Sequence, residues 1–281
     1  MARVEERISD RRVLKLIRKW LEVGVMEDGT VRETLCGTPQ GGVLSPLLAN
    51  IYLHELDRIW ETRCKFLGVL VRYADDLVVM CQRGSAAREA RRRIGIVMER
   101  LGLELHPKKT RLVDLRRGKE GFVFVGCTVR KRRSIQRNPR WQFVQRWPSP
   151  RAMKRIRERV HELTEDRRSG AKRVREVIAV LNPVLRGWGN YFRAGNADRK
   201  FNQVDQYVHE RLNRWQWRRR GQRGQFRFDE WPHRRHYEMG LYRLRGTVRY
   251  PAQATDVRPS LSRVREMRMH GLKGGAGNGP A

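Results

Sequence analysis

The sequence predicts an α+β fold: an antiparallel sheet with helices up to residue 129, then an all-α domain of three helices and a basic tail. Three observations support this class. Segments with helical periodicity alternate with short β-branched runs over residues 1–129. Prolines and cations accumulate over residues 130–149, which is typical of a basic linker. Apolar residues at intervals of three and four then recur through residues 150–220, as in a small helical bundle.

The bulk composition indicates a polyanionic partner. The 281 residues include 62 Lys and Arg against 30 Asp and Glu, a net charge of +32, and nucleic acid is the first candidate for such a surface. A membrane surface is the rival, but no apolar run is long enough to span a bilayer and no signal peptide follows Met1. The four cysteines show no C-x-x-C spacing, which favours reduced thiols of a cytoplasmic protein over a zinc site or a disulfide framework.

Two helices are predicted before residue 61. Ser9 and Asp10 can cap the first, and Ser45 can cap the second, with Pro46 at its first position. A short strand is expected between them, over residues 31–35. The apolar residues recur at helical intervals: Val13, Leu14, Ile17 and Leu21 in the first helix, and Leu47, Leu48, Ile51, Leu53, Leu56, Ile59 and Trp60 in the second.

A glycine-rich segment, Gly37–Pro46, precedes the second helix. Its three glycines and two prolines exclude regular structure and let the backbone come close to a ligand. A glycine-rich turn that leads into a helix N-terminus suits contact with phosphate or sugar. An ordinary junction between loop and helix is the alternative interpretation.

Two adjacent carboxylates, Asp75 and Asp76, lie between apolar runs in the segment Val69–Met80. The pattern predicts a strand, a tight turn and a returning strand, with the carboxylates at the tip. Like charges this close repel unless a cation holds them, and Mg²⁺ takes carboxylate oxygens and bridges to phosphates. The alternative is an ordinary hairpin turn, in which Asp is common.

Residues 86–101 predict another amphipathic helix, which Gly102 ends. A turn over residues 103–110 and a strand over 110–115 should follow. Residues 121–129 alternate like a pair of hairpin strands near a sheet edge.

Residues 130–159 hold 12 Lys or Arg and one Glu, a charge of +11. A solvated charge run is the usual explanation. The interleaved aromatic residues Trp141, Phe143 and Trp147 favour nucleic acid instead, because aromatic rings beside cations can stack on bases or sugars.

Three helices are predicted in residues 150–220. The second is expected to be interrupted by Pro183, and the third to begin after Phe192. Residues 221–281 hold 12 Lys or Arg and five Asp or Glu, a charge of +7, with little periodicity. The glycine-rich end from Gly271 is expected to be disordered.

Five motifs, in order along the chain, resemble those of group II intron-encoded reverse transcriptases and maturases. The first two, residues 37–50 and the Tyr-Ala-Asp-Asp of residues 73–76, resemble the motifs that flank a polymerase active site. The others are Leu103–Thr110, the hairpin at residues 122–126, and a maturase (X or thumb) pattern formed by residues 181–192 and 201–215. His106 stands where Asn is commoner in that family. The resemblance identifies residues 1–129 as part of a polymerase palm and residues 150–220 as a maturase helical domain.

The resemblance implies roles for individual residues. Asp75 and Asp76 would be catalytic and hold Mg²⁺ in a two-metal site, with Asp75 the direct ligand. Gln40, Gly41, Gly42 and Tyr73 would border the template and the incoming nucleotide. Lys109 would lie near the nucleotide phosphates, although a surface lysine is an equal alternative. The candidate RNA-binding residues are Arg130, Lys131, Arg132, Arg133, Arg186, Trp188 and Arg193.

The sequence also departs from the family pattern. A complete member carries an upstream strand with a further metal-binding Asp, and fingers before it. In this chain Asp10 fits a helix cap and Asp28 a turn, so neither fills that role. The expectation is an N-terminally truncated palm, inactive as a polymerase alone. A truncated or mis-started reading frame is favoured over a split protein or a shortened RNA-binding protein, because the cut runs through a domain.

The expected function is therefore that of an RNA-directed DNA polymerase and intron maturase. Its partners would be group II intron RNA, an RNA template with a DNA primer, and deoxynucleoside triphosphates, with target DNA as a further candidate. The alternative is a non-catalytic intron RNA-binding splicing cofactor. A generic basic protein of ribosomal type ranks last, because it leaves the glycine-rich turn and the acidic hairpin without a role.

Overall fold

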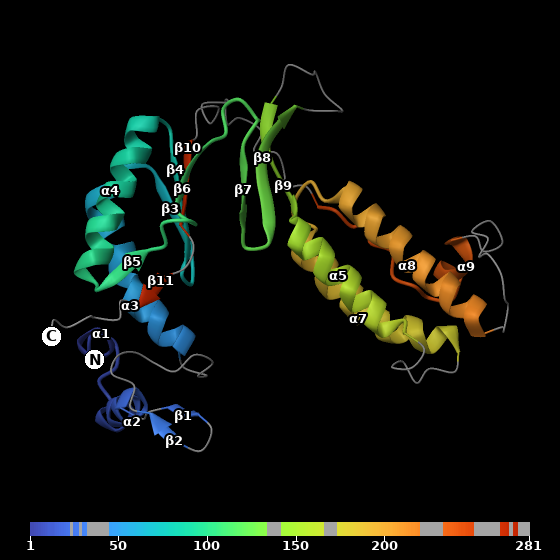
Figure 1. The fold of residues 1–281 in the computed structure, drawn as a ribbon, viewed down its shortest axis with the longest axis horizontal. Helices are drawn as coiled ribbons and strands as arrows, with labels where there is room; N and C mark the ends of the chain where they lie inside the picture. Colours follow the sequence, from blue (N-terminus) through green and yellow to red (C-terminus); the bar gives the residue numbers. More distant parts are fainter. Residues whose placement is uncertain are drawn as a thin grey trace. The chain divides into compact units, whose positions relative to one another are not determined.

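The computed structural model describes residues 1–22, 25–27, 30–32, 45–133, 142–165, 173–219, 233–249, 265–269 and 272–274. These residues combine helices with small antiparallel sheets (Figure 1), as the predicted α+β class requires. The chain divides into two compact units, residues 1–113 with 263–281 and residues 114–262. Each unit has its own buried core. Among the described helices, none is long and apolar enough to cross a membrane.

The first unit contains a four-stranded sheet in the order β3-β4-β10-β6. Tyr73 at the end of β3 pairs with Asp76 at the start of β4, so these strands form the predicted hairpin. In β10, Arg265 pairs antiparallel with Cys81 of β4. A separate two-stranded pair joins β5 to β11. The bounds are β3 Val69–Tyr73, β4 Asp76–Cys81, β5 Leu103–Leu105, β6 Arg111–Asp114, β10 Arg265–Met269 and β11 Leu272–Gly274.

The strands β10 and β11 correct the expectation for the C-terminal segment. Residues 272–274 were predicted to fall in a disordered end, yet they pair with β5. Strand β10 lies between β4 and β6 in the sheet order. Local periodicity cannot reveal such a strand, because its partner strand β4 lies nearly two hundred positions earlier in the sequence. The two strands are joined by backbone hydrogen bonds, which leave no pattern in the side chains.

Helices α3 and α4 cover one face of this sheet (Figure 1). In strand β4, Leu77, Val79 and Cys81 are buried in one core with Leu56 of α3 and Ile94 of α4. Asp10 caps α2 as predicted, since its carboxylate accepts hydrogen bonds from the backbone N–H of Arg12 (2.7 Å) and of Val13 (3.4 Å). The bounds are α1 Ala2–Glu5, α2 Arg11–Glu22, β1 Val25–Glu27, β2 Thr30–Arg32, α3 Ser45–Ile59, η1 Trp60–Cys64, η2 Lys65–Leu67 and α4 Gly84–Arg100.

The described cysteines are free thiols. Cys64 and Cys81 are buried and Cys127 is partly buried. Burial raises the pKa of the Cys81 thiol to about 11, so this thiol stays protonated and behaves as a small apolar side chain.

The second unit begins with a three-stranded antiparallel sheet, β7 Gly121–Phe124, β8 Cys127–Arg133 and β9 Gln142–Pro148. This sheet corrects the expectation of a linker over residues 130–149, because both β8 and β9 continue into that range. The register places Arg132 opposite Phe143 and Thr128 opposite Trp147. The Arg132 guanidinium lies 4.5 Å from the Trp147 ring centre, so the cations and aromatic residues of this stretch alternate across paired strands.

A two-residue turn, Val125-Gly126, joins β7 to β8. Both residues have positive φ, 44° for Val125 and 72° for Gly126, and Phe124 pairs with Cys127. This is the arrangement of a type I′ hairpin turn, whose first position favours Asn and disfavours a β-branched residue.

Replacing Val125 with Asn is therefore expected to stabilise the second unit by about 1 kcal/mol, because Asn adopts positive φ at lower cost than Val. Thermal unfolding followed by circular dichroism measures the effect. Val144→Asn is the matched control, since Val144 is 47% exposed on the regular strand β9 and should gain nothing. An equal or lower melting temperature for Val125→Asn would contradict the strain argument.

Three long helices, α5 Pro150–Leu163, α7 Val174–Phe192 and α8 Asp198–Arg219, share the core of the second unit with the short α9 His233–Glu238. Ser149 caps α5, because its Oγ accepts a hydrogen bond from the N–H of Ala152 at 3.2 Å. The core residues include Ile156 of α5, Leu181 of α7 and Phe201 of α8, all nearly inaccessible to solvent.

Helix α7 corrects the expected break at Pro183. The helix runs through this proline to Phe192, so the Gly187–Phe192 motif lies on its last turns. A proline inside a helix costs about 3 kcal/mol. The buried stripe of α7 offsets this cost, since it contributes Val177, Ile178, Leu181, Leu185, Gly189 and Phe192 to the core.

An irregular segment, residues 239–249, follows α9 and is tied to α7 and α8 by two side chains. The Asn182 amide donates to the carbonyl of Gly240 (2.9 Å) and accepts from the N–H of Tyr242 (2.8 Å). The Asp205 carboxylate accepts from the N–H groups of Leu244 (3.0 Å) and Arg245 (2.8 Å). These bonds hold a segment without regular secondary structure in one conformation.

Candidate functional site

The acidic turn between β3 and β4 is the best candidate site. Ala74 and Asp75 form a two-residue turn, in which Ala74 has a φ of 53°. Asp75 is exposed, while Asp76 is partly exposed at the first position of β4. Tyr73 lies opposite Asp76 in the hairpin and is 63% exposed. The hairpin therefore presents two carboxylates and a phenol at one end of the sheet.

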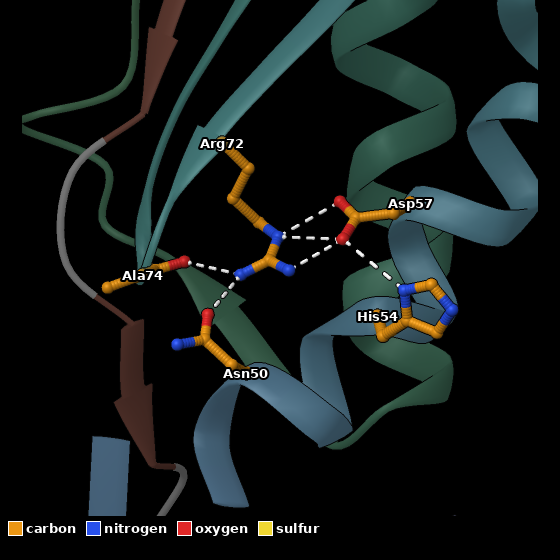
Figure 2. Close-up of polar contacts among 5 residues, drawn as sticks. All are labelled: Asn50, His54, Asp57, Arg72 and Ala74. Atoms are coloured by element: carbon orange, nitrogen blue, oxygen red, sulfur yellow. Dashed lines mark hydrogen bonds and ion pairs between the residues drawn. The ribbon is translucent and has the colours of Figure 1, made fainter. Parts of the chain in front are cut away.

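Arg72 fixes this turn to helix α3 (Figure 2). Its Nη1 donates to the carbonyl oxygen of Ala74 at 2.9 Å and to Oδ1 of Asn50 at 2.8 Å. Its Nε donates to Oδ1 of Asp57 at 2.9 Å, and its Nη2 donates to Oδ2 of the same carboxylate at 2.5 Å. His54 Nδ1 lies 3.7 Å from that Oδ2. One guanidinium thus joins the turn to two residues of α3, and we refer to Arg72, Asn50 and Asp57 as the turn brace.

Within the turn brace, Arg72 is the member most shielded from water, whereas Asn50 is exposed. The Arg72 side chain is 12% exposed and that of Asp57 is 29% exposed. A planar guanidinium that bonds a carboxylate through two nitrogens has little rotational freedom. The brace therefore limits movement of the backbone immediately before Asp75.

The two carboxylates suit a hard divalent cation. Within the described residues, the Asp75 carboxylate forms no hydrogen bond or ion pair, so its oxygens are available to a ligand. No group of three or more His, Cys, Asp or Glu side chains that could hold a metal ion occurs in the described part of the chain. Mg²⁺ keeps several waters and binds through one or two carboxylates plus substrate phosphates, so Asp75 and Asp76 are residues that could hold it.

The other nucleotide-site candidates lie in different places. Lys109 is exposed in the turn between β5 and β6, and its N–H donates to the carbonyl of His106 at 3.1 Å. The predicted contacts Gln40, Gly41 and Gly42 fall outside the described residues.

The candidate RNA-binding residues divide into exposed and packed groups. Arg132, Arg133 and Arg186 are exposed, and Arg186 lies 5.3 Å from the ring centre of Tyr242. Lys131 and Arg193 are partly buried. Arg130 is also partly buried, and its Nε donates to the carbonyl of Gly118 at 2.8 Å.

Trp188 packs within the second unit, and its role in RNA binding stays a prediction. Its ring centre lies 4.9 Å from that of Phe192 and 5.4 Å from that of Phe201, and it packs against the core of the second unit.

Sequence reasoning missed the turn brace. Asn50 and Asp57 are seven positions apart, which places them on the same face of α3. Arg72 directly precedes the Tyr-Ala-Asp-Asp sequence and is a charged residue in an otherwise apolar strand. These two signals could have indicated an ion pair between the helix and the strand.

Two family models match the chain. Residues 3–129 match the family model "Reverse transcriptase (RNA-dependent DNA polymerase)", and residues 153–236 match "Group II intron, maturase-specific domain". The group II intron-encoded protein LtrA of Lactococcus lactis is 51% identical over 61 residues, which cover 21% of this chain and 10% of LtrA.

Two further relatives cover more of the chain. An uncharacterized 91 kDa protein in the cob intron of Schizosaccharomyces pombe is 25% identical over 260 residues, which cover 68% of this chain and 32% of that protein. Protein YkfC of Escherichia coli is 31% identical over 166 residues, which cover 48% of this chain and 43% of YkfC. The matched regions therefore span less than half the length of each relative.

Proposed function

Because the chain belongs to the reverse transcriptases and maturases encoded by group II introns, we propose that its acidic turn serves RNA-directed DNA synthesis and its second unit binds intron RNA. The single observation that carries the first part is the exposed Asp75 carboxylate, which has no protein partner in the described residues and lies on a braced turn. In this reaction a primer 3′-hydroxyl would attack the α-phosphate of a deoxynucleoside triphosphate and release pyrophosphate.

Each residue of the turn has a distinct part in this proposal. Asp75 and Asp76 would hold Mg²⁺, which when bound stabilises the attacking and leaving oxygens of phosphoryl transfer. Arg72 would keep the turn in place through the carbonyl of Ala74, at 2.9 Å. Tyr73, 63% exposed beside the turn, would contact the primer or the nucleotide. Gln40, Gly41, Gly42 and Lys109 remain proposed contacts to the template and the nucleotide.

The proposed RNA partner rests on charge. The net charge of +32 favours a polyanion, Arg132 and Arg133 are exposed on β8, and Arg132 lies over the Trp147 ring of β9. Intron RNA, an RNA template with its DNA primer, and target DNA are proposed ligands. The same observations support a second candidate function, a splicing cofactor that binds intron RNA without polymerising DNA.

Asp75→Asn tests the two candidates against each other. Extension of a DNA primer on an RNA template is measured for the purified chain with Mg²⁺; where extension occurs, Asp75→Asn should lower its rate at least about 100-fold, because an amide is a poor Mg²⁺ ligand. Binding of intron RNA should change less than about two-fold, since one exposed charge of this sign adds little to phosphate contacts. Glu104→Gln, an exposed carboxylate of the same unit, is the matched control.

The outcomes separate the functions. Extension by the wild type and the control, and not by Asp75→Asn, supports the polymerase. A wild type that binds intron RNA but extends no primer leaves the splicing cofactor as the function of this chain. Equal extension by all three proteins would exclude Asp75 from the site.

A further inference from the structure

A cavity of about 460 Å³ lies in the second unit between α8, α9 and the segment 239–249. Three arginines line it: Arg234 of α9, and Arg243 and Arg245 of the segment. Its volume is in the range of ordinary ligand sites in proteins. Neither the acidic turn nor the candidate RNA-binding residues named above form part of it.

The buried carboxylate of Asp205 holds two of these arginines at the cavity. Its oxygens accept hydrogen bonds from the backbone N–H groups of Leu244 and Arg245, at 3.0 and 2.8 Å. Leu244 is fully buried in the core. Arg243 and Arg245, on either side of the buried Leu244, both line the cavity.

The cavity carries net positive charge, because three arginines and one carboxylate, Asp205, line it. Arg243 and Arg245 form no ion pair within the described residues. Arg234 pairs with Glu238 at 2.9 Å, and its side chain is 88% exposed, so that pair is weak. Asp205 uses its oxygens on backbone N–H groups, and burial raises its pKa. An anion would therefore meet three guanidinium groups and one carboxylate that faces the backbone.

The neutral lining adds hydrogen-bonding groups beside this charge. Asn202 and Gln206 line the cavity from successive turns of α8. Tyr237 of α9 also lines it, with the Arg243 guanidinium 5.5 Å from its ring centre. Guanidinium groups bind phosphate oxygens through two nitrogens. Amides and phenols can both donate a hydrogen bond to a ribose 2′-hydroxyl and accept one from it.

We propose that this cavity binds the phosphodiester backbone of RNA and contacts its ribose 2′-hydroxyl. The proposal rests on the proposed function, in which the second unit binds intron RNA, and it names the site. Arg243 and Arg245 contact phosphate oxygens, and Asn202 and Gln206 read the sugar. RNA is favoured over DNA because the amides have a partner only where a 2′-hydroxyl is present.

The test compares two double variants that remove the same charge. Arg243→Gln with Arg245→Gln changes the cavity, while Arg151→Gln with Arg155→Gln changes two exposed arginines of α5 in the same unit. The probe is a single-stranded RNA from the intron, titrated by fluorescence anisotropy at several salt concentrations. We expect the cavity variant to bind at least about ten-fold more weakly, with a salt slope reduced by about 1.4, because two phosphate contacts to a single strand are lost. The α5 variant should weaken binding less than three-fold.

A third variant keeps the charge and tests sugar recognition. Asn202→Ala with Gln206→Ala should lower the preference for RNA over DNA of the same sequence about five-fold or more, without changing the salt slope. This variant keeps the proposal falsifiable if the arginine variants fail to fold, which thermal unfolding detects. Equal weakening by the cavity and α5 variants, or an unchanged RNA preference in the third variant, would overturn the proposal. A wild type that binds no RNA would instead refute the proposed function itself.

Discussion

An Arg72→Met variant is expected to bind divalent metal at the acidic turn about ten- to a hundred-fold more weakly than the wild type, as when groups that orient metal ligands are removed. The substitution removes the hydrogen bonds to Ala74, Asn50 and Asp57 (2.5–2.9 Å). The backbone before Asp75 then loses its link to α3, and the carboxylates no longer share one fixed position. Methionine keeps the length of the apolar stem, so the side chain still fills the space beneath the strand.

The loss in stability should be smaller than the loss in metal binding. Asp57 is left without its main partner, but its side chain is 29% exposed and water can reach it. We expect the free energy of unfolding to fall by about 1–3 kcal/mol. Arg72→Lys should restore only part of the metal affinity, because one ammonium cannot bond Asp57 and the carbonyl of Ala74 in the geometry of a guanidinium.

Iron-directed cleavage measures the position of the metal without any need for polymerase activity. Fe²⁺ replaces Mg²⁺, and hydroxyl radicals formed with peroxide cut the backbone beside the bound ion. Fragments ending at residues 74–76 should appear for the wild type and for Arg58→Met, an exposed arginine of α3 that pairs with Glu55. Identical cleavage in Arg72→Met would show that the brace positions nothing.

The acidic hairpin could be predicted from the sequence because its signal is local. Two β-branched runs flank Ala74 and Asp75, and the structure pairs Tyr73 with Asp76 across the turn. The cap of Asp10 was predicted for the same reason, since a cap depends on the next few residues. The turn brace is not local: it joins Arg72 to residues 15 and 22 positions away, and only the packing of α3 on the sheet brings them together.

The wrong predictions share a cause. Residues 130–149 contain prolines and many cations, which indicate a linker by composition, but β8 and β9 are stabilised by pairing with each other and by rings and guanidinium groups that meet across the strands. Pro183 indicates a helix break by propensity, but burial of the α7 stripe outweighs it. In both places tertiary contacts override a local preference, and those contacts cannot be predicted from composition.

The cavity arginines were also missed, since Arg243 and Arg245 lie in a segment with little periodicity. Their position depends on Asp205, which is 38 and 40 residues earlier in the chain. In the sequence, Asp205 is one acidic residue within the maturase pattern, and nothing there shows that it is buried. Only the three-dimensional structure shows that Asp205 lies next to Arg243 and Arg245.

Asp205→Asn is expected to lower the free energy of unfolding of the second unit by about 1–3 kcal/mol at neutral pH, because it leaves a buried donor without an acceptor. The carboxylate accepts from two backbone N–H groups, and the Asn amide offers one oxygen and turns its NH₂ toward the other donor. Hydrogen exchange at the amides of Leu244 and Arg245 measures the effect where it arises. Glu158→Gln, a 55% exposed carboxylate of α5, is the control and should change stability by less than about 0.5 kcal/mol.

The pH dependence of this difference has a definite sign. Burial raises the pKa of Asp205, against the opposing effect of the two backbone hydrogen bonds and of Arg243 and Arg245. Because the pKa of Asp205 is higher in the folded state, the folded protein binds the proton first as pH falls. Protonation of Asp205 therefore adds its full contribution to the free energy of unfolding below the unfolded pKa of about 3.9, and this contribution is lost as pH rises through the folded pKa. The deficit of Asp205→Asn relative to the wild type should therefore be larger near pH 4 than at pH 7. A deficit that shrinks on acidification would show that hydrogen bonds and nearby charges outweigh burial and lower the pKa of Asp205.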